Sequence, residues 1–207
     1  MSKAWFRRRQ KDQYHQLAKK RGYRSRAAYK LKQLDKKLKL FKKAKTVVDL
    51  GAAPGGWLQV ESEMVGNEGF VIGIDKRIIE PLEQSNIKII QGDITEESII
   101  TSIKQVLEEK LILEVHVDVV TSDVSPNVSG IWELDHARQI ALARASLRII
   151  EEILKTGGNA VIKVFQGIMF NEFVDDTKAL FHRIKIMKPS ASRRKSAEIY
   201  VIGLKRK

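Results

Sequence analysis

Hydrophobic and polar positions alternate in short blocks after residue 45, and these blocks predict strands and helices in turn. Residues 46–50 and 117–123 have the near-continuous hydrophobicity of strands that are buried on both faces. Further strands are predicted at residues 70–75, 87–91, 159–165, 184–187 and 199–203. Because strands that alternate with helices build parallel sheets, the pattern predicts an α/β fold with helices on both faces of a mostly parallel sheet.

The helices are predicted from apolar residues that recur at helical spacing between the strands. The strongest pattern covers residues 136–154, where apolar side chains return every three or four positions. Gly157 and Gly158 are predicted to end this helix, because glycine favours helix termination. Shorter helices are predicted at residues 57–65, 99–107 and 173–181.

The formal net charge of +13 is distributed unevenly along the 207 residues. Residues 1–45 carry a net charge of +16 and residues 183–207 a net charge of +8, whereas the segment between them carries −11. Two basic ends on an acidic body favour a polyanionic partner, most commonly nucleic acid. Aromatic residues lie among the N-terminal cations, which favours RNA over a solvated tail or a membrane surface. They are Trp5, Phe6, Tyr14, Tyr23 and Tyr29.

Composition excludes several classes of protein. The chain contains no cysteine, so disulfides and cysteine-based metal or redox sites are excluded. The sequence has no apolar run that reaches the ~18 residues of a membrane span, and its basic start lacks the apolar region of a signal peptide. We therefore expect a cytoplasmic monomer without a metal site. Its length suits one α/β domain at residues 46–207, preceded by a basic RNA-binding extension at residues 1–45.

A glycine-rich turn, Asp49-Leu-Gly-Ala-Ala-Pro-Gly-Gly-Trp57, follows the first predicted strand. Its glycines let the backbone approach a ligand closely, but their spacing differs from the G-x-G-x-x-G of nicotinamide-dependent reductases. Asp75, Asp93 and Asp123 stand at the ends of the next three predicted strands. One such aspartate is ordinarily a helix cap, but three favour an adenosyl cofactor. Their carboxylates can accept hydrogen bonds from its ribose hydroxyls and its adenine amino group.

Five segments, in this order, resemble the FtsJ/RrmJ family of 2′-O-ribose RNA methyltransferases. They are residues 24–31, 49–57, 122–127, 162–167 and 192–200. The resemblance covers nearly the whole chain and implies a Rossmann-like seven-stranded methyltransferase sheet with S-adenosylmethionine as cofactor. The cofactor contacts that it implies are Gly55, Trp57, Asp75, Asp93 and Asp123. The catalytic tetrad that it implies consists of Lys30, Asp123, Lys163 and Glu198.

Lys163 is the centre of the expected chemistry, because it stands in an otherwise apolar predicted strand. A buried lysine is costly unless it is paired or neutral, and the neighbouring strand ends in Asp123. We hypothesise that Lys163 orients the ribose hydroxyl and accepts its proton, while Asp123 and Glu198 hold Lys163 and Lys30. In the alternative, a charged Lys163 orients the hydroxyl and stabilises the alkoxide. A lysine that reaches solvent at the strand edge is the structural alternative.

Cations near these motifs are predicted to contact RNA phosphates. They are Arg7, Arg8, Arg9, Lys19, Lys20, Arg21, Arg24, Arg26, Arg193 and Arg194. Residues 54–57 and 125–127 resemble the family members that modify a uridine in the A-loop of 23S-type large-subunit rRNA. Residues 124–125 and 131–133 depart from that bacterial pattern. A methyltransferase of tRNA anticodon loops and a non-catalytic RNA-binding assembly factor are the alternative functions.

Overall fold

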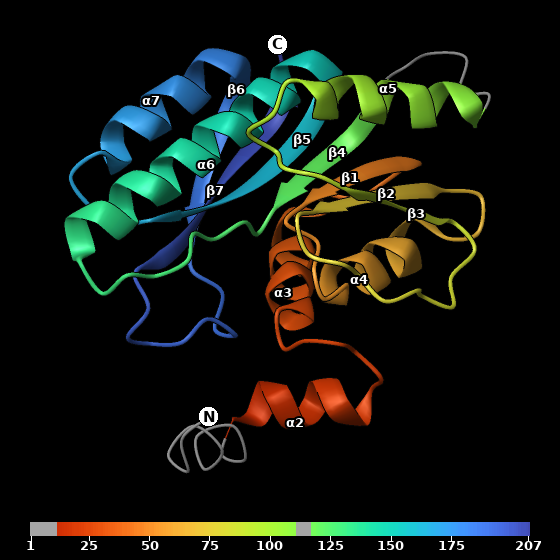
Figure 1. The fold of residues 1–207 in the computed structure, drawn as a ribbon, viewed down its shortest axis with the longest axis horizontal. Coiled ribbons are helices and arrows are strands. Elements are labelled where there is room, and N and C mark those ends of the chain that lie inside the picture. The colour runs from red at the N-terminus through yellow and green to blue at the C-terminus, as the bar shows by residue number, and fades with distance from the viewer. Residues whose placement is uncertain (1–11, 111–116) are drawn as a thin grey trace.

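The computed structural model describes residues 12–110 and 117–207, which form one seven-stranded sheet with helices on both faces (Figure 1). The strand order is β3-β2-β1-β4-β5-β7-β6, in which β7 runs antiparallel to both neighbours and the other pairs are parallel. The strands are β1 (Thr46–Leu50), β2 (Phe70–Asp75), β3 (Ile87–Gln91), β4 (Val117–Ser122), β5 (Leu154–Phe165), β6 (Phe181–Met187) and β7 (Glu198–Arg206). The seven-stranded Rossmann-like sheet expected from the sequence is therefore confirmed.

Helices cover both faces of this sheet in two layers (Figure 1). They are α2 (Gln13–Lys20), α3 (Ala28–Leu38), α4 (Gly56–Val65), α5 (Ser98–Glu109), α6 (Trp132–Ile153) and α7 (Phe170–Leu180). Residues of α5, α6 and α7 pack on one face, and residues of α3 and α4 pack on the other. The short α2 lies beyond α3, where Tyr14 packs against Tyr29 with ring centroids 5.7 Å apart.

Successive residues of the central strands point to opposite faces, so each of these strands contributes to two cores. Val120 and Ile162 belong to the core under α5, α6 and α7, whereas Val119 and Val161 belong to the core under α3 and α4. Leu31 of α3 is fully buried in the second core. This burial fixes the helix that carries Lys30 against the sheet.

The helix predicted at residues 136–154 differs from the structure at both ends. α6 begins four residues earlier, at Trp132, and ends at Ile153, where Leu154 takes extended backbone and opens β5. The prediction that Gly157 and Gly158 end the helix was wrong, because both glycines lie inside β5. Glycine in a strand commonly marks a bulge, and the register between β4 and β5 shifts in this region.

The helices α2 and α3 fall in the charge-rich segment where the sequence pattern predicted no elements. The Asp12 side chain caps α2 by accepting a hydrogen bond from the His15 N–H. In α3, the buried residues Ala28, Leu31 and Leu34 recur every three positions, which places them on one face of the helix. No helix in residues 12–110 or 117–207 combines the length and the hydrophobicity that crossing a membrane requires.

Candidate active site

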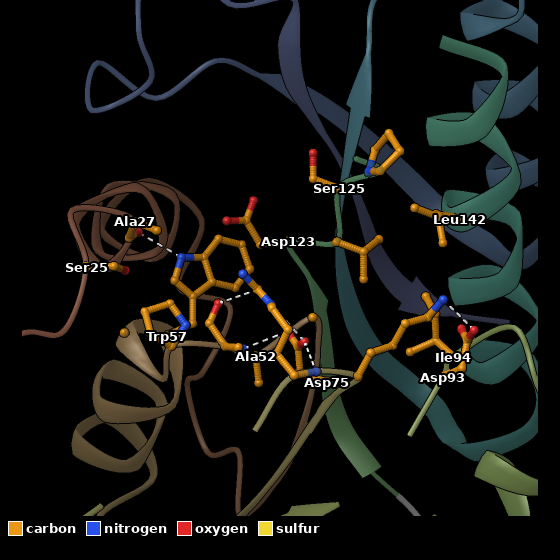
Figure 2. Close-up of a pocket in the computed structure, with 18 of the residues that line it drawn as sticks. Ser25, Ala27, Ala52, Trp57, Asp75, Asp93, Ile94, Asp123, Ser125 and Leu142 are labelled. Atoms are coloured by element: carbon orange, nitrogen blue, oxygen red, sulfur yellow. Dashed lines mark hydrogen bonds and ion pairs between the residues drawn. The ribbon is translucent and has the colours of Figure 1, made fainter. Parts of the chain in front are cut away.

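A cavity of about 700 Å³ opens at the carboxyl ends of the central strands, where α/β sheets bind their ligands (Figure 2). Its walls come from the loops that follow β1, β2, β3 and β4, together with Ser25 and Ala27 before α3 and Leu142 of α6. The loop residues are 51–54 and 56–57, 75–77, 92–94 and 123–127. The three aspartates predicted at successive strand ends therefore line one cavity.

Close approach of three backbone segments shapes the floor of this cavity. Gly51 has a φ of +79°, and a Cβ added to it would lie 2.9 Å from the backbone nitrogen of Val124. A Cβ on Gly56 would lie 2.2 Å from the Ser25 hydroxyl. Trp57 is almost completely buried, and its indole N–H donates to the Ala27 carbonyl at 2.7 Å. Glycine at these positions thus lets the loop after β4 and the segment before α3 meet at the turn.

Gly55 lies beside this cavity and is not among the residues that line it. It precedes α4 with a φ of +103°, and a Cβ at this position would contact the Arg24 side chain at 3.3 Å. The glycine therefore makes room for the arginine. A direct contact between Gly55 and the cofactor stays a prediction.

Asp75 and Asp93 present carboxylates to the cavity. Asp75 accepts hydrogen bonds from the Ala53 N–H at 2.9 Å and the Arg77 N–H at 2.9 Å. Burial alone would raise the pKa of Asp75, but hydrogen bonds from the Arg77 and Ala53 groups lower it below its ordinary value. Burial would also raise the pKa of Asp93, but the interactions with Lys76 and Thr95 together lower it below its ordinary value. Both side chains are therefore ionised acceptors at neutral pH.

These features fit an adenosyl cofactor. The cavity has the size of small-molecule sites, and it combines apolar walls from Ala52, Trp57 and Ile94 with acceptors from Asp75 and Asp93 (Figure 2). The ribose hydroxyls and the adenine amino group of such a cofactor are donors that carboxylates bind. Asp75 would hold the ribose and Asp93 the adenine.

The four residues of the predicted tetrad meet beside the cavity. Lys30 of α3 lies between two carboxylates, with its Nζ 2.7 Å from Glu198 Oε1 and 3.9 Å from Asp123 Oδ2. Lys163 of β5 lies 3.2 Å from the other Asp123 oxygen and donates to the Asp123 backbone carbonyl at 2.6 Å. Two cations and two carboxylates thus form one continuous chain, with Asp123 at its centre and on the cavity wall.

Comparison with protein families matches residues 23–206 to the family described as FtsJ-like methyltransferase. The chain belongs to this family. The expected resemblance is confirmed, and S-adenosylmethionine is the methyl donor of this methyltransferase.

Curated relatives and solved structures agree with this assignment. The methyltransferase is 49% identical over 201 residues to ribosomal RNA large subunit methyltransferase E of Methanocaldococcus jannaschii, covering 97% of this chain and 81% of the relative. It is 51% identical over 196 residues to the protein of the same name from Methanothrix thermoacetophila, covering 95% and 73%. A crystal structure from Plasmodium falciparum, assigned as a ribosomal RNA methyltransferase, superposes with a TM-score of 0.78 at 32% identity and covers 89% of this chain and 98% of its own.

A more distant structure shares the fold alone. The fibrillarin of Aeropyrum pernix, solved with bound S-adenosylmethionine, superposes with a TM-score of 0.51 at 15% identity. The superposition covers 78% of this methyltransferase and 66% of the fibrillarin chain.

Tyr200 supports the tetrad, although sequence reasoning did not assign it a role. Its buried hydroxyl donates to Asp123 Oδ1 at 2.8 Å. Burial would raise the pKa of Asp123, but Lys163, Lys30 and the Tyr200 hydroxyl lower it below its ordinary value. The sequence could have pointed to Tyr200 through its spacing from Glu198, because residues two positions apart in a strand lie on the same face.

Two further contacts hold the remaining members of the tetrad. Ser192, in the loop before β7, donates from its hydroxyl to Glu198 Oε1 at 2.8 Å. Gln139 of α6 donates to the Lys163 carbonyl at 2.9 Å, and this fixes the helix on the strand that carries the lysine. The residues of the predicted tetrad are thus positioned from both faces of the sheet.

The predicted RNA contacts fall into three groups. Arg24 donates to the carbonyl oxygens of Pro54, Glu80 and Pro81, and Arg26 pairs with Asp12, so these two guanidinium groups already bind within the protein. The exposed group consists of Lys19, Lys20, Arg21, Arg193 and Arg194. Arg7, Arg8 and Arg9 lie outside the described residues. Phosphate contacts by all of these residues stay predictions.

No cluster of three or more His, Asp or Glu side chains within residues 12–110 and 117–207 could hold a metal ion.

Proposed function

We propose that this methyltransferase methylates the 2′-hydroxyl of a ribose in large-subunit rRNA, with a uridine of the A-loop as the target. The observation that carries the proposal is the ion-pair chain of Lys30, Asp123, Lys163 and Glu198 at the edge of the cofactor cavity. Its relatives named ribosomal RNA large subunit methyltransferase E support the choice of RNA.

The chain's own residues contribute positioning and a proton acceptor. When bound, S-adenosylmethionine supplies a methyl group on a positively charged sulfur, so holding the ribose oxygen in line accounts for much of the catalysis. We assign the orientation of the 2′-hydroxyl to Lys163, which is 5% exposed and therefore cannot swing freely. Asp123 and Glu198 hold the amino groups of the two lysines in place through ion pairs.

The contacts of Lys163 define what its amino group can do. Two of its N–H groups have acceptors on Asp123, the backbone carbonyl and Oδ1. The third tetrahedral position of the nitrogen is then available to the substrate. In the neutral amine that position holds the lone pair, which can accept the hydroxyl proton, whereas in the ammonium it holds a donor for the 2′-oxygen. We propose the first role, as a general base.

Methyl transfer from tritiated S-adenosylmethionine tests this function directly. Large ribosomal subunits, free rRNA and tRNA are incubated in parallel, and the modified nucleotide is mapped. Label at a 2′-oxygen of an A-loop uridine supports the proposal. Label in the anticodon loop of tRNA would show that the same reaction acts on tRNA and not on rRNA. RNA binding without label would indicate a non-catalytic assembly factor.

We further propose that residues 1–45 and the loop before β7 bind RNA phosphates. Replacing Lys19, Lys20 and Arg21 with glutamine is expected to weaken RNA binding, because each exposed cation that neutralises a phosphate releases a counterion. The slope of log K against log salt concentration should become shallower by about 2 for single-stranded RNA. Filter binding between low and physiological salt measures this slope.

A charge-matched variant serves as the control for this measurement. Replacing Lys88, Lys155 and Lys178 with glutamine removes the same charge from exposed positions on β3, β5 and α7, outside the two basic ends. This variant should keep the wild-type slope. Equal slopes in both variants would contradict an RNA-binding role for residues 19–21.

A further inference from the structure

An exposed apolar patch lies at the start of α6, next to the loop that follows β5. Trp132 is 45% exposed and Ile168 is 94% exposed, which is unusual for large apolar side chains beside an active site. Ile131 and Val128, in the loop that leads from Asp123 to α6, are also more than half exposed. The tetrad chemistry assigns no role to this patch.

The Trp132 ring is held by two other rings. It stacks on His136 with centroids 5.8 Å apart and planes inclined by 21°, and on Phe165 with centroids 6.2 Å apart and planes inclined by 22°. His136 is itself fixed, because its Nε2 accepts the Met169 N–H at 3.1 Å and the Gly167 backbone leaves no space for a Cβ beside the ring. The half-exposed aromatic surface of Trp132 is therefore held in a fixed orientation.

This surface is joined rigidly to the catalytic residues. Phe165 follows Lys163 by two positions on β5, about 7 Å along the strand, and is the register partner of Glu198. The Asp135 carboxylate accepts hydrogen bonds from the backbone N–H groups of Ser129 and Gly130, which ties the loop after Asp123 to the first turn of α6. Gln139 then connects the same helix to the Lys163 carbonyl at 2.9 Å.

We propose that Trp132, backed by Phe165 and His136, stacks on the base of a nucleotide that flanks the acceptor ribose. The proposal rests on the proposed function, in that the substrate is RNA. A flat aromatic surface suits an unstacked nucleobase, because every base has a π-face and stacking needs no particular hydrogen-bond pattern. The separation between Lys163 and Phe165 along β5 suits neighbouring nucleotides of an unstacked strand. Exposed Arg193 and Arg194, in the loop before Glu198, supply charge for the adjoining phosphates.

We call the Trp132 ring, backed by Phe165 and His136, the stacking platform. Methyl transfer by Trp132→Ala and Trp132→Phe variants tests this platform. The alanine variant should raise the KM for RNA roughly tenfold, as expected for the loss of one stacked base, while the affinity for S-adenosylmethionine stays unchanged. The phenylalanine variant should recover most of the loss. Ile186→Ala, which truncates another 45% exposed apolar residue on β6, should behave like wild type.

RNA that lacks a base at one flanking position separates stacking from a general structural effect. On this abasic RNA, Trp132→Ala and wild type should have the same KM, because the stacking partner is missing. An alanine effect of equal size on intact and abasic RNA would overturn the proposal. An effect confined to assembled ribosomal subunits would also overturn it, because it would indicate a protein contact.

Tryptophan fluorescence tests the platform without methyl transfer. The difference in emission between wild type and Trp132→Phe isolates the contribution of Trp132, and single-stranded RNA oligonucleotides should quench it. An abasic ribose-phosphate oligomer of the same length should not. Quenching without methylation of any RNA would support stacking by Trp132 and contradict the proposed function. Methylation without quenching would contradict stacking by Trp132 alone.

Discussion

Replacing Lys163 with alanine is expected to lower the rate of methyl transfer by about 100- to 10,000-fold, the usual contribution of a positioned general base. The affinity for S-adenosylmethionine should be unchanged, because Lys163 does not line the cofactor cavity. Asp123 keeps Lys30 and the Tyr200 hydroxyl as partners in this variant, so the site retains its shape. Single-turnover transfer to RNA and calorimetric titration with the cofactor measure the two effects.

The Lys163→Arg variant distinguishes between the two roles of the amino group. Arginine can orient the hydroxyl and stabilise an alkoxide, but it stays protonated at every accessible pH and cannot accept a proton. A base mechanism therefore predicts an inactive arginine variant. A fully active arginine variant would exclude the base role and retain the charged, orienting lysine.

The contribution of Glu61, in α4, to the stability of the protein is expected to fall as the pH rises from about 4.5 to about 8. This side chain is completely buried, and burial raises the pKa of Glu61 from 4.5 to about 8, although a hydrogen bond from the Thr121 hydroxyl at 2.7 Å opposes the shift. Asp49 of β1 lies in the same buried group. Burial, together with the neighbouring Glu61 and Asp123 carboxylates, raises the pKa of Asp49 well above its ordinary value.

The direction of this stability change follows from the numbers of protons bound by the folded and the unfolded chain. Between these two pKa values the unfolded chain loses the Glu61 proton while the folded chain keeps it, so rising pH favours the unfolded state. The contribution of Glu61 to the free energy of unfolding is complete below pH 4.5, decreases through this window and is constant above pH 8. The loss amounts to at most about 5 kcal/mol, at 1.36 kcal/mol per pH unit.

Glu61→Gln tests this account, because glutamine preserves the shape and the acceptor for Thr121 without an ionisable proton. Its free energy of unfolding should depend less steeply on pH between 5 and 8 than that of wild type, with a residual slope from Asp49. Urea denaturation at several pH values measures this. Glu68→Gln, at an exposed position just beyond α4, is the control and should follow wild type. Parallel curves for Glu61→Gln and wild type would contradict the buried-acid explanation.

The strands and the pairing of Lys163 with Asp123 were predictable because each left a local mark in the sequence, whereas Lys30 and Glu198 were expected only from the family resemblance. Val47-Val48 and Val119-Val120 are continuous apolar pairs in strands buried on both faces. Lys163 was conspicuous as a charge in an apolar strand, and the structure pairs it with Asp123 as expected. Spacing alone does not give distances, but aspartates at the ends of parallel strands necessarily gather at one edge of the sheet.

Other features depend on contacts between distant segments, which periodicity cannot reveal. Arg24 looked like a phosphate contact among many cations, yet its guanidinium reaches carbonyl groups after β1 and β2. Trp132 lies in a segment that departs from the pattern of the bacterial rRNA methyltransferases. Its ring partners come from β5 and from the next turn of α6. The glycines at 157 and 158 were misjudged because they follow the end of α6 closely but lie inside β5, where the register with β4 shifts.

Strand β7 is inserted between β5 and β6, and it contributes Glu198 while α3, near the other end of the described chain, contributes Lys30. The tetrad is therefore assembled from residues 168 positions apart. A nascent polypeptide that has not yet released residues 198–206 lacks both Glu198 and the Tyr200 hydroxyl. On the proposed roles of residues 1–45 and of the tetrad, partly synthesised chains should bind nucleic acid yet modify none of it until translation has passed β7.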